Sequence, residues 1–99
     1  MSRGPDAGTR LARALEQSRP GVIVVRRESA PWASVTFNGA RHRIALTLPD
    51  VDEADEWIES LSEADLVIPG HLVADLTVAR VTRHGGTVAI AIDVLTVAT

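Results

Sequence analysis

Residues 32–48 constrain the fold more than any other stretch, because they have the pattern of a β-hairpin that turns at Asn38-Gly39. An Asn-Gly pair between β-type segments is typical of a two-residue type I′ turn, since both turn positions require a positive φ. Such a turn fixes the register of the two strands and predicts Val35 opposite His42. The hairpin is therefore the frame on which the other segments are placed.

The predicted hairpin has one apolar face and one polar, basic face. The apolar face is expected to hold Phe37, Val35, Ile44, Leu46 and Leu48, with His42 as its single polar residue. The opposite face is expected to present Trp32, Arg41 and Arg43. A register shift of one residue would bury both arginines, so the pattern is internally consistent.

The residues before the hairpin predict a helix and a strand. Residues 9–18 carry apolar side chains at helical spacing. Residues 22–28 begin with four consecutive β-branched residues, which predicts an inner strand buried on both faces. Residues 29–31, Ser-Ala-Pro, are expected to separate this strand from the hairpin.

The residues after the hairpin predict a second helix and two long strands. Asp50, followed by Glu53 three residues later, resembles a capping box at the start of an amphipathic helix over residues 50–64. Alternation over residues 71–83 and 87–98 predicts two strands joined by a Gly-Gly turn, with apolar residues on both faces.

Together these segments predict a single α+β domain with the order α-β-β-β-α-β-β. We expect a mostly antiparallel five-stranded sheet with its helices on one face. The 99 residues are enough for one core and too few for two. The domain is expected to span residues 9–99, after a flexible leader over residues 1–8.

The composition excludes several classes of site. The chain has no cysteine, so disulfides and thiolate chemistry are excluded. No stretch has the apolar length of a signal or membrane segment, and we expect a cytoplasmic protein with no membrane partner. An isoelectric point near 5.5 and the lack of lysine make nucleic acid an unfavourable partner. The sequence predicts no catalytic or cofactor motif and no metal site, and it favours a non-enzymatic role.

Charge is segregated along the chain. Residues 1–49 contain eight arginines and three carboxylates, whereas residues 50–65 contain eight carboxylates and no basic residue. The predicted interaction surface consists of Trp32, Asp52, Asp55, Glu56, Glu59 and Glu63. The acidic helix face is either a solvated face or a docking surface for a basic partner, including a second copy of the chain.

The histidines and nearby charges give the candidate ligand site, which consists of Arg41, His42, Arg43, His71 and Asp75. On an apolar face, the His42 imidazole needs a hydrogen-bond partner, and it is either a structural histidine or a functional one. His71 and Asp75 would stand about 13 Å apart in one strand, so they cannot form a dyad by themselves.

These observations leave three functional hypotheses open. The first is a small interaction or structural protein that forms a homodimer through its sheet, motivated by the two-sided apolarity of residues 72–78 and 88–97. The second is a module that binds a small anionic ligand through Arg41, Arg43 and His42. The third is an acid-base enzyme that uses His42 with Asp75 or Asp93.

Overall fold

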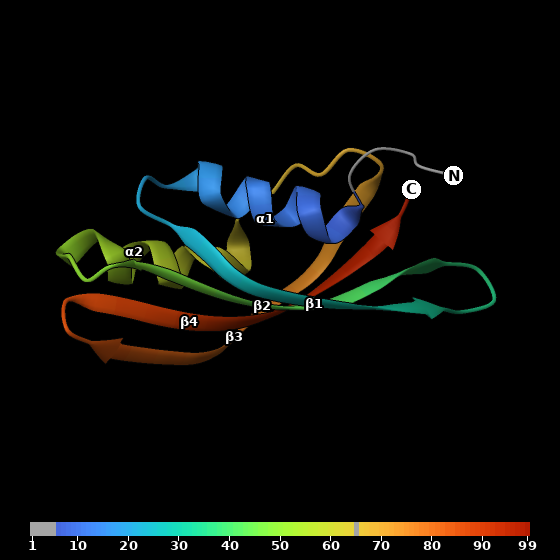
Figure 1. Ribbon diagram of the computed structural model, residues 1–99. Helices are drawn as coiled ribbons and strands as arrows, with labels where there is room; N and C mark the ends of the chain where they lie inside the picture. The colour runs from blue at the N-terminus through green and yellow to red at the C-terminus, as the bar shows by residue number, and fades with distance from the viewer. Residues whose placement is uncertain (1–5, 65) are drawn as a thin grey trace.

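The computed structural model describes residues 6–64 and 66–99, and in these residues two α-helices pack on a four-stranded antiparallel sheet (Figure 1). The elements are α1 (Ala7–Ser18), β1 (Ile23–Ala33), β2 (Asn38–Pro49), α2 (Asp52–Ser60), the 3-10 helix η1 (Leu61–Glu63), β3 (His71–His84) and β4 (Thr87–Ala98). The strand order is β1-β2-β4-β3, so β1 and β3 are the edges. Residues 1–5 of the expected leader lie outside the described residues.

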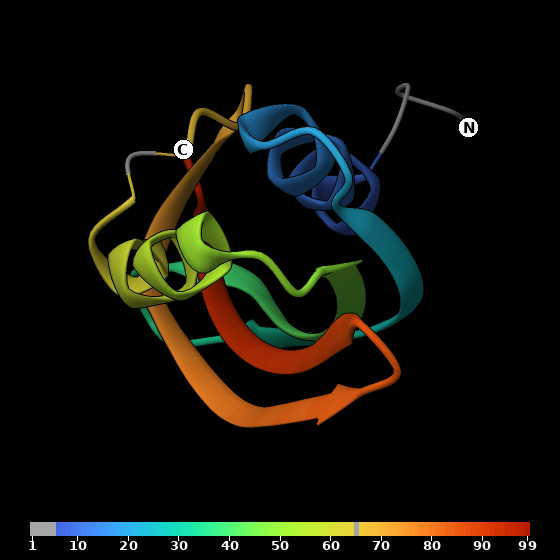
Figure 2. The ribbon, with the colours of Figure 1, turned by 90° about the vertical axis from the view of Figure 1, so that its left-hand side faces the viewer.

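Both helices lie on the same face of the sheet, as the sequence predicted. The sheet curves around them, which encloses the core between its concave face and the helices (Figure 2). The core consists mainly of Leu11 and Leu15 from α1, Ile44, Leu46 and Leu48 from β2, Ala54 from α2, Leu61 from η1, Leu76 from β3, and Val88, Ile90, Ile92 and Val94 from β4. An aliphatic core of this kind agrees with an aromatic content of only 3%.

The prediction of five strands was wrong, because two of the expected strands form one. β1 runs without interruption through Ser29, Ala30 and Pro31, where a break was expected. Proline is tolerated there because β1 is an edge strand, in which one side of the backbone has no ladder partner. The expected inner strand over residues 22–28 is therefore part of an edge, and Val25 is exposed at a bulge.

The predicted hairpin turn at Asn38-Gly39 was also wrong. The turn spans residues 34–37, where the Ser34 N–H donates to the Phe37 carbonyl at 2.7 Å and the Phe37 N–H donates to Ser34 Oγ at 3.0 Å. Asn38 consequently pairs with Ala33, and His42 faces Ser29. The expected core residues Val35 and Phe37 lie on this exposed turn.

Gly39 is needed for a reason other than the one its sequence context suggests. Positive φ occurs at Gly21, Gly70, Gly85 and Gly86 among the described residues. A Cβ atom on Gly39 would lie 1.9 Å from the Thr96 carbonyl oxygen, so this position in β2 has no room for a side chain.

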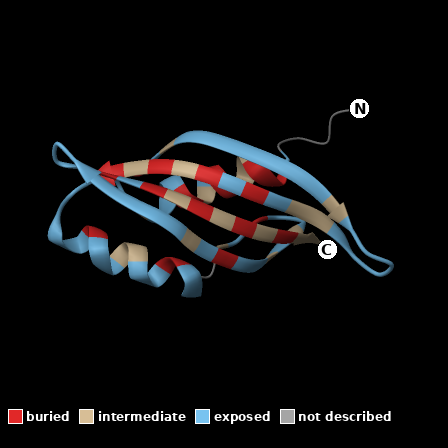
Figure 3. Ribbon diagram, turned by 90° about the horizontal axis from the view of Figure 1, so that it is seen from below, coloured by how far each residue is buried: buried red, intermediate tan, exposed pale blue. Residues whose placement is uncertain are grey.

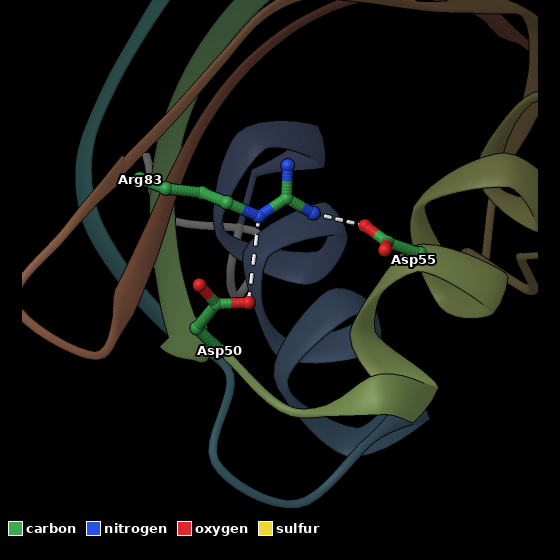
Figure 4. Close-up of polar contacts among 3 residues, drawn as sticks. All are labelled: Asp50, Asp55 and Arg83. Carbon is green, nitrogen blue, oxygen red and sulfur yellow. Dashed lines mark hydrogen bonds and ion pairs between the residues drawn. The ribbon is translucent and has the colours of Figure 1, made fainter.

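The start of α2 differs from the expected capping box. Val51 is the N-cap and makes no side-chain capping bond. Asp50 instead accepts a hydrogen bond from Arg83, whose Nε lies 3.4 Å from its carboxylate, and the same guanidinium also pairs with Asp55 (Figure 4). Arg83 of β3 thus ties the sheet to the beginning of α2.

The C-terminal hairpin has the predicted turn and nearly the predicted strand bounds, but a register shift in β3 puts Leu72 and Leu76 on opposite faces, where regular alternation had placed them on one. β3 and β4 are joined at Gly85 and Gly86, which have φ values of 60° and 82°, as a type I′ turn requires. Along β4, Val88, Ile90 and Ile92 are buried, whereas the intervening residues are exposed or half-buried. The apolar alternation therefore assigned the faces of β4 correctly.

Candidate functional site

The face of the sheet turned away from both helices is covered by no described element, and we call it the outer face. Along β2 and β4, buried residues alternate with exposed and half-buried ones, and the latter point to this outer face (Figure 3). The strand register arranges its residues in rows across the sheet, which include Ala30, Arg41, Leu95 and Asp75 in one row, Glu28, Arg43, Asp93 and Thr77 in the next, and Arg26, Ala45, Ala91 and Arg80 in a third.

The charges on the outer face are mixed rather than purely basic. Arg43 lies between Glu28 and Asp93 in the register, and its Nε is 3.3 Å from Asp93 Oδ1. Arg26 is paired with Glu28 at 2.6 Å. Exposed ion pairs of this kind contribute only about 0 to 1 kcal/mol each to stability. Their arrangement can nevertheless select a partner surface and its orientation.

A shallow hollow of about 430 Å³ lies on this face, and four of the predicted ligand-binding residues line it. Its lining includes Arg41, Arg43, Asp75, Asp93 and Leu95. The structure thus brings Arg41, His42, Arg43 and Asp75 to one hollow. Two arginines and the three carboxylates of Glu28, Asp75 and Asp93 give the hollow a mixed charge.

His42 borders the hollow, but its imidazole has its partners within the structure. The residue is only 3% exposed. Its Nδ1 lies 2.7 Å from Ser29 Oγ on β1, and its Nε2 lies 2.9 Å from Thr96 Oγ1 on β4. His42 therefore links the three strands β1, β2 and β4 by side-chain hydrogen bonds.

The hydrogen bonds of Thr96 fix the tautomer of His42. Thr96 Oγ1 donates its only hydrogen to the Ala40 carbonyl at 3.3 Å, so it accepts from His42 Nε2–H. His42 Nδ1 then accepts from the Ser29 hydroxyl. Burial lowers the pKa of His42, and the carboxylate of Asp6 opposes this effect only in part, so the neutral imidazole is favoured.

Asp6 and Gly8 belong to the first turn of α1 and cover this hydrogen-bond network. Asp6 is the N-cap, and its Oδ1 accepts from the Thr9 N–H at 2.8 Å, which lowers the pKa of its carboxyl group. A Cβ atom on Gly8 would lie 2.9 Å from Ser29 Oγ. The helix thus packs directly against Ser29, which agrees with a structural role of the network.

The structure does not bring His42 together with the carboxylates that an acid-base enzyme would use. Asp75 and Asp93 face outward next to Leu95 and Arg43, whereas the His42 imidazole points to the helix side. His71 lies at the start of β3 and is outside the lining of the hollow. Its Nδ1 is shielded from solvent and has no hydrogen-bond partner among the described residues.

The predicted interaction surface is divided between two places. The acidic residues Asp52, Asp55, Glu56, Glu59 and Glu63 are exposed on α2 and η1, where Arg83 pairs with Asp55. Trp32 is half-buried on β1, and its Nε1 donates to the Thr96 carbonyl at 3.2 Å. Trp32 therefore belongs to the opposite end of β1 from the acidic helix, near the hairpin turn (Figure 1).

Sequence reasoning missed Ser29 and Thr96 as partners of His42, and it missed the exposure of Val35 and Phe37. A sequence signal for Thr96 existed: it follows Val88, Ile90, Ile92 and Val94 at the same alternate spacing and is the polar residue in this buried row of β4. His42 interrupts the buried row of β2 in the same way. Two polar interruptions on facing strands are a signal for a buried hydrogen bond.

Comparison of the chain with protein-family models, curated proteins and solved structures finds no match. In the part of the chain that the structure describes, no three His, Cys, Asp or Glu side chains are grouped as metal ligands would be. The helices of the same part are too short or too polar to cross a membrane.

Proposed function

We propose that this protein is a small interaction protein that forms a homodimer by burying the outer face of its sheet. The observation that carries the proposal is that both helices cover one face, while no described element covers the outer face, where Leu72 is exposed and Leu95 and Val97 are half-buried. Leu72 is 58% exposed. Apolar sheet surface of this kind is typically buried in an interface.

The edges of the sheet are less suitable for pairing with a second chain. The edge strand β1 has a bulge between Val24 and Arg26. The other edge strand, β3, has irregular pairing between Val73 and Asp75 and again further along the strand. Bulges interrupt the regular row of backbone donors and acceptors that an added strand would need. Contact through the face is therefore favoured over contact through an edge.

The centre of the outer face is suited to close approach by another surface. Ala45 and Ala91 lie side by side in the register of β2 and β4, and their methyl groups leave room for facing side chains. The Arg43–Asp93 pair lies in the adjacent row and can align two copies by its charge. The centre therefore combines a small alanine surface, which allows close approach, with charged pairs in the neighbouring positions that can orient a second copy.

Sedimentation velocity at micromolar concentrations tests the proposal. We expect a dimer for the natural chain and a monomer for Ala91→Arg, which places a long charged side chain at the centre of the face. Gln17→Arg, at an exposed position of α1, is the matched control and should remain dimeric. A monomeric natural chain would contradict the proposal, and so would an Ala91→Arg variant that dimerises normally.

A second candidate function is the binding of a small anionic ligand in the hollow beside Arg41. Arg41 lines the hollow and forms no ion pair within residues 6–64 and 66–99. Thermal-shift measurements with phosphate, sulfate and small carboxylates test this idea. Stabilisation should be lost in Arg41→Gln and retained in Arg13→Gln on α1, and an unchanged response in Arg41→Gln would refute it.

A further inference from the structure

The turn between β1 and β2 projects from the body of the molecule and exposes apolar side chains. We call residues 32–39 the arm, which lies at one end of the elongated molecule (Figure 1). Val35 is fully exposed and Phe37 is 57% exposed at its tip. The described chain leaves more than half of the Phe37 surface uncovered. The arm therefore presents apolar surface that only another molecule can bury.

The arm is held in a defined conformation despite this exposure. Three hydrogen bonds between Ser34 and Phe37 close its turn. At its base, Trp32 donates a hydrogen bond to the Thr96 carbonyl, and Gly39 lies against the same backbone group. A preordered turn loses little conformational entropy on binding, so its apolar side chains are suited to contact a partner.

The apolar part of the outer face begins directly at the base of the arm. Trp32, Gly39, Val97 and Leu72 follow one another across the sheet in register, and Leu95 lies in the next row. We call Leu72, Leu95 and Val97 the apolar end. The arm and the apolar end are thus adjacent surfaces at the same end of the molecule.

We propose that in the homodimer the arm of each copy lies across the apolar end of the other. This inference rests on the proposed function and assigns what covers one end of the outer face. Because the arm and its receptor share one end of the molecule, a two-fold axis that runs along the strands between the two outer faces brings the like ends together. Both arm contacts then form at once, and the alanines at the centre of the two faces still meet. Phe37 then packs against Leu72 and Val97 of the second copy.

The charges around the apolar end favour a second copy as the occupant. Arg41 and Asp75 are on either side of Leu95 in the register, one positive and one negative. A surface bordered by one charge of each sign is self-complementary under a two-fold rotation, because each arginine can face the aspartate of the other copy. A strongly acidic or basic partner would meet one like charge.

Cross-linking between two single-cysteine variants tests the contact directly, because the natural chain has no cysteine. Thr36→Cys places a thiol at the tip of the arm, and Leu72→Cys places one in the apolar end. We expect a short bismaleimide to join the two variants when they are mixed and to join Thr36→Cys to itself much less. Preferential linkage of Thr36→Cys to itself would overturn the inference, because it would place the two tips together.

Sedimentation equilibrium of Phe37→Asp provides a second measurement. The exposed position allows the variant to fold, which a thermal melt by circular dichroism verifies, and we expect its dimer dissociation constant to rise about tenfold or more. Val67→Asp, at an exposed apolar position outside the arm, is the matched control. An unchanged dimer in Phe37→Asp would overturn the role of the arm and leave the homodimer standing, whereas a monomeric natural chain would overturn both.

Discussion

Replacing Thr96 by valine isolates the energetic role of the buried network around His42. The substitution keeps the size and β-branching of the side chain and removes only the hydroxyl group that accepts from His42 Nε2–H. The Ser29 hydroxyl can satisfy His42 Nδ1 in either tautomer, but no remaining group can satisfy Nε2. One ring nitrogen of a residue that is almost completely buried thus loses its partner.

Thr96→Val also removes the hydrogen bond to the Ala40 carbonyl, but that bond is long at 3.3 Å, so the expected cost follows mainly from the loss at the buried ring nitrogen. A buried polar group without a partner costs about 1 to 3 kcal/mol, so we expect Thr96→Val to lower the free energy of unfolding by about 2 kcal/mol. For a chain of this length, that loss corresponds to a decrease in melting temperature of about 8 to 16 °C. Urea denaturation at pH 7.5, followed by circular dichroism, measures it. Thr82→Val, at an exposed position of β3, is the control and should change stability by less than about 0.5 kcal/mol.

A double-mutant cycle separates the hydrogen bond from other effects of the valine. In a His42→Leu background there is no imidazole to leave unsatisfied, so the additional cost of Thr96→Val should fall below about 0.5 kcal/mol. The same cost in both backgrounds would refute the reasoning, because it would show that the hydroxyl acts independently of His42. A negligible cost in the natural background would refute it as well.

Three further predictions concern the same region. Because burial lowers the pKa of His42, the folded state binds fewer protons than the unfolded chain at mildly acidic pH. The urea midpoint of unfolding should therefore fall as the pH drops through about 6.5, and His42→Gln should abolish this pH dependence. Asp6→Ala removes the cap that accepts from Thr9 N–H and should cost about 1 kcal/mol in thermal melts, whereas a neutral result would argue against the cap. Gly39→Ala forces a methyl group against the Thr96 carbonyl and should destabilise by about 3 kcal/mol in urea, and a stable variant would contradict the close approach.

The segments that the sequence predicted well are those whose signals are local. Alternation assigned the faces of β4, the Gly85-Gly86 pair located its turn, and helical spacing located α1 to within a few residues. Each of these patterns depends only on residues close together in the sequence, and in the structure the apolar residues of each pattern face the core as expected. The placement of both helices on one face followed from the apolar stripes.

The hairpin was predicted wrongly because long-range pairing competes with local turn preference. Asn38-Gly39 favours a two-residue turn, but that turn would leave residues 22–28 to find another neighbour. The observed turn, which Ser34 stabilises, joins both segments into one strand that pairs along nearly the whole of β2. Gly39 then allows the backbone of β4 to lie close to β2, which is a contact between residues far apart in sequence.

The candidate site could be predicted only in part for the same reason. Arg41 and Arg43 share a face of β2 by simple alternation. Asp75 lies near them only because β4 stands between β2 and β3, and the sequence does not reveal this strand order. The partners of His42 likewise come from β1 and β4. The exposure of Phe37 depended on the true position of the turn, which moved it from the expected core to the tip of the arm.

The strand order β1-β2-β4-β3 divides the molecule into two similar halves. Each half is a helix followed by an antiparallel hairpin, and the second strands of the two hairpins, β2 and β4, meet antiparallel in the middle of the sheet. Each half has only about 50 residues and buries too small a share of its surface to be more than marginally stable, so neither half is expected to be stable without the other. The β2–β4 seam, which also contains the bond from His42 to Thr96, is therefore the place where a chain of two local units becomes one cooperative domain.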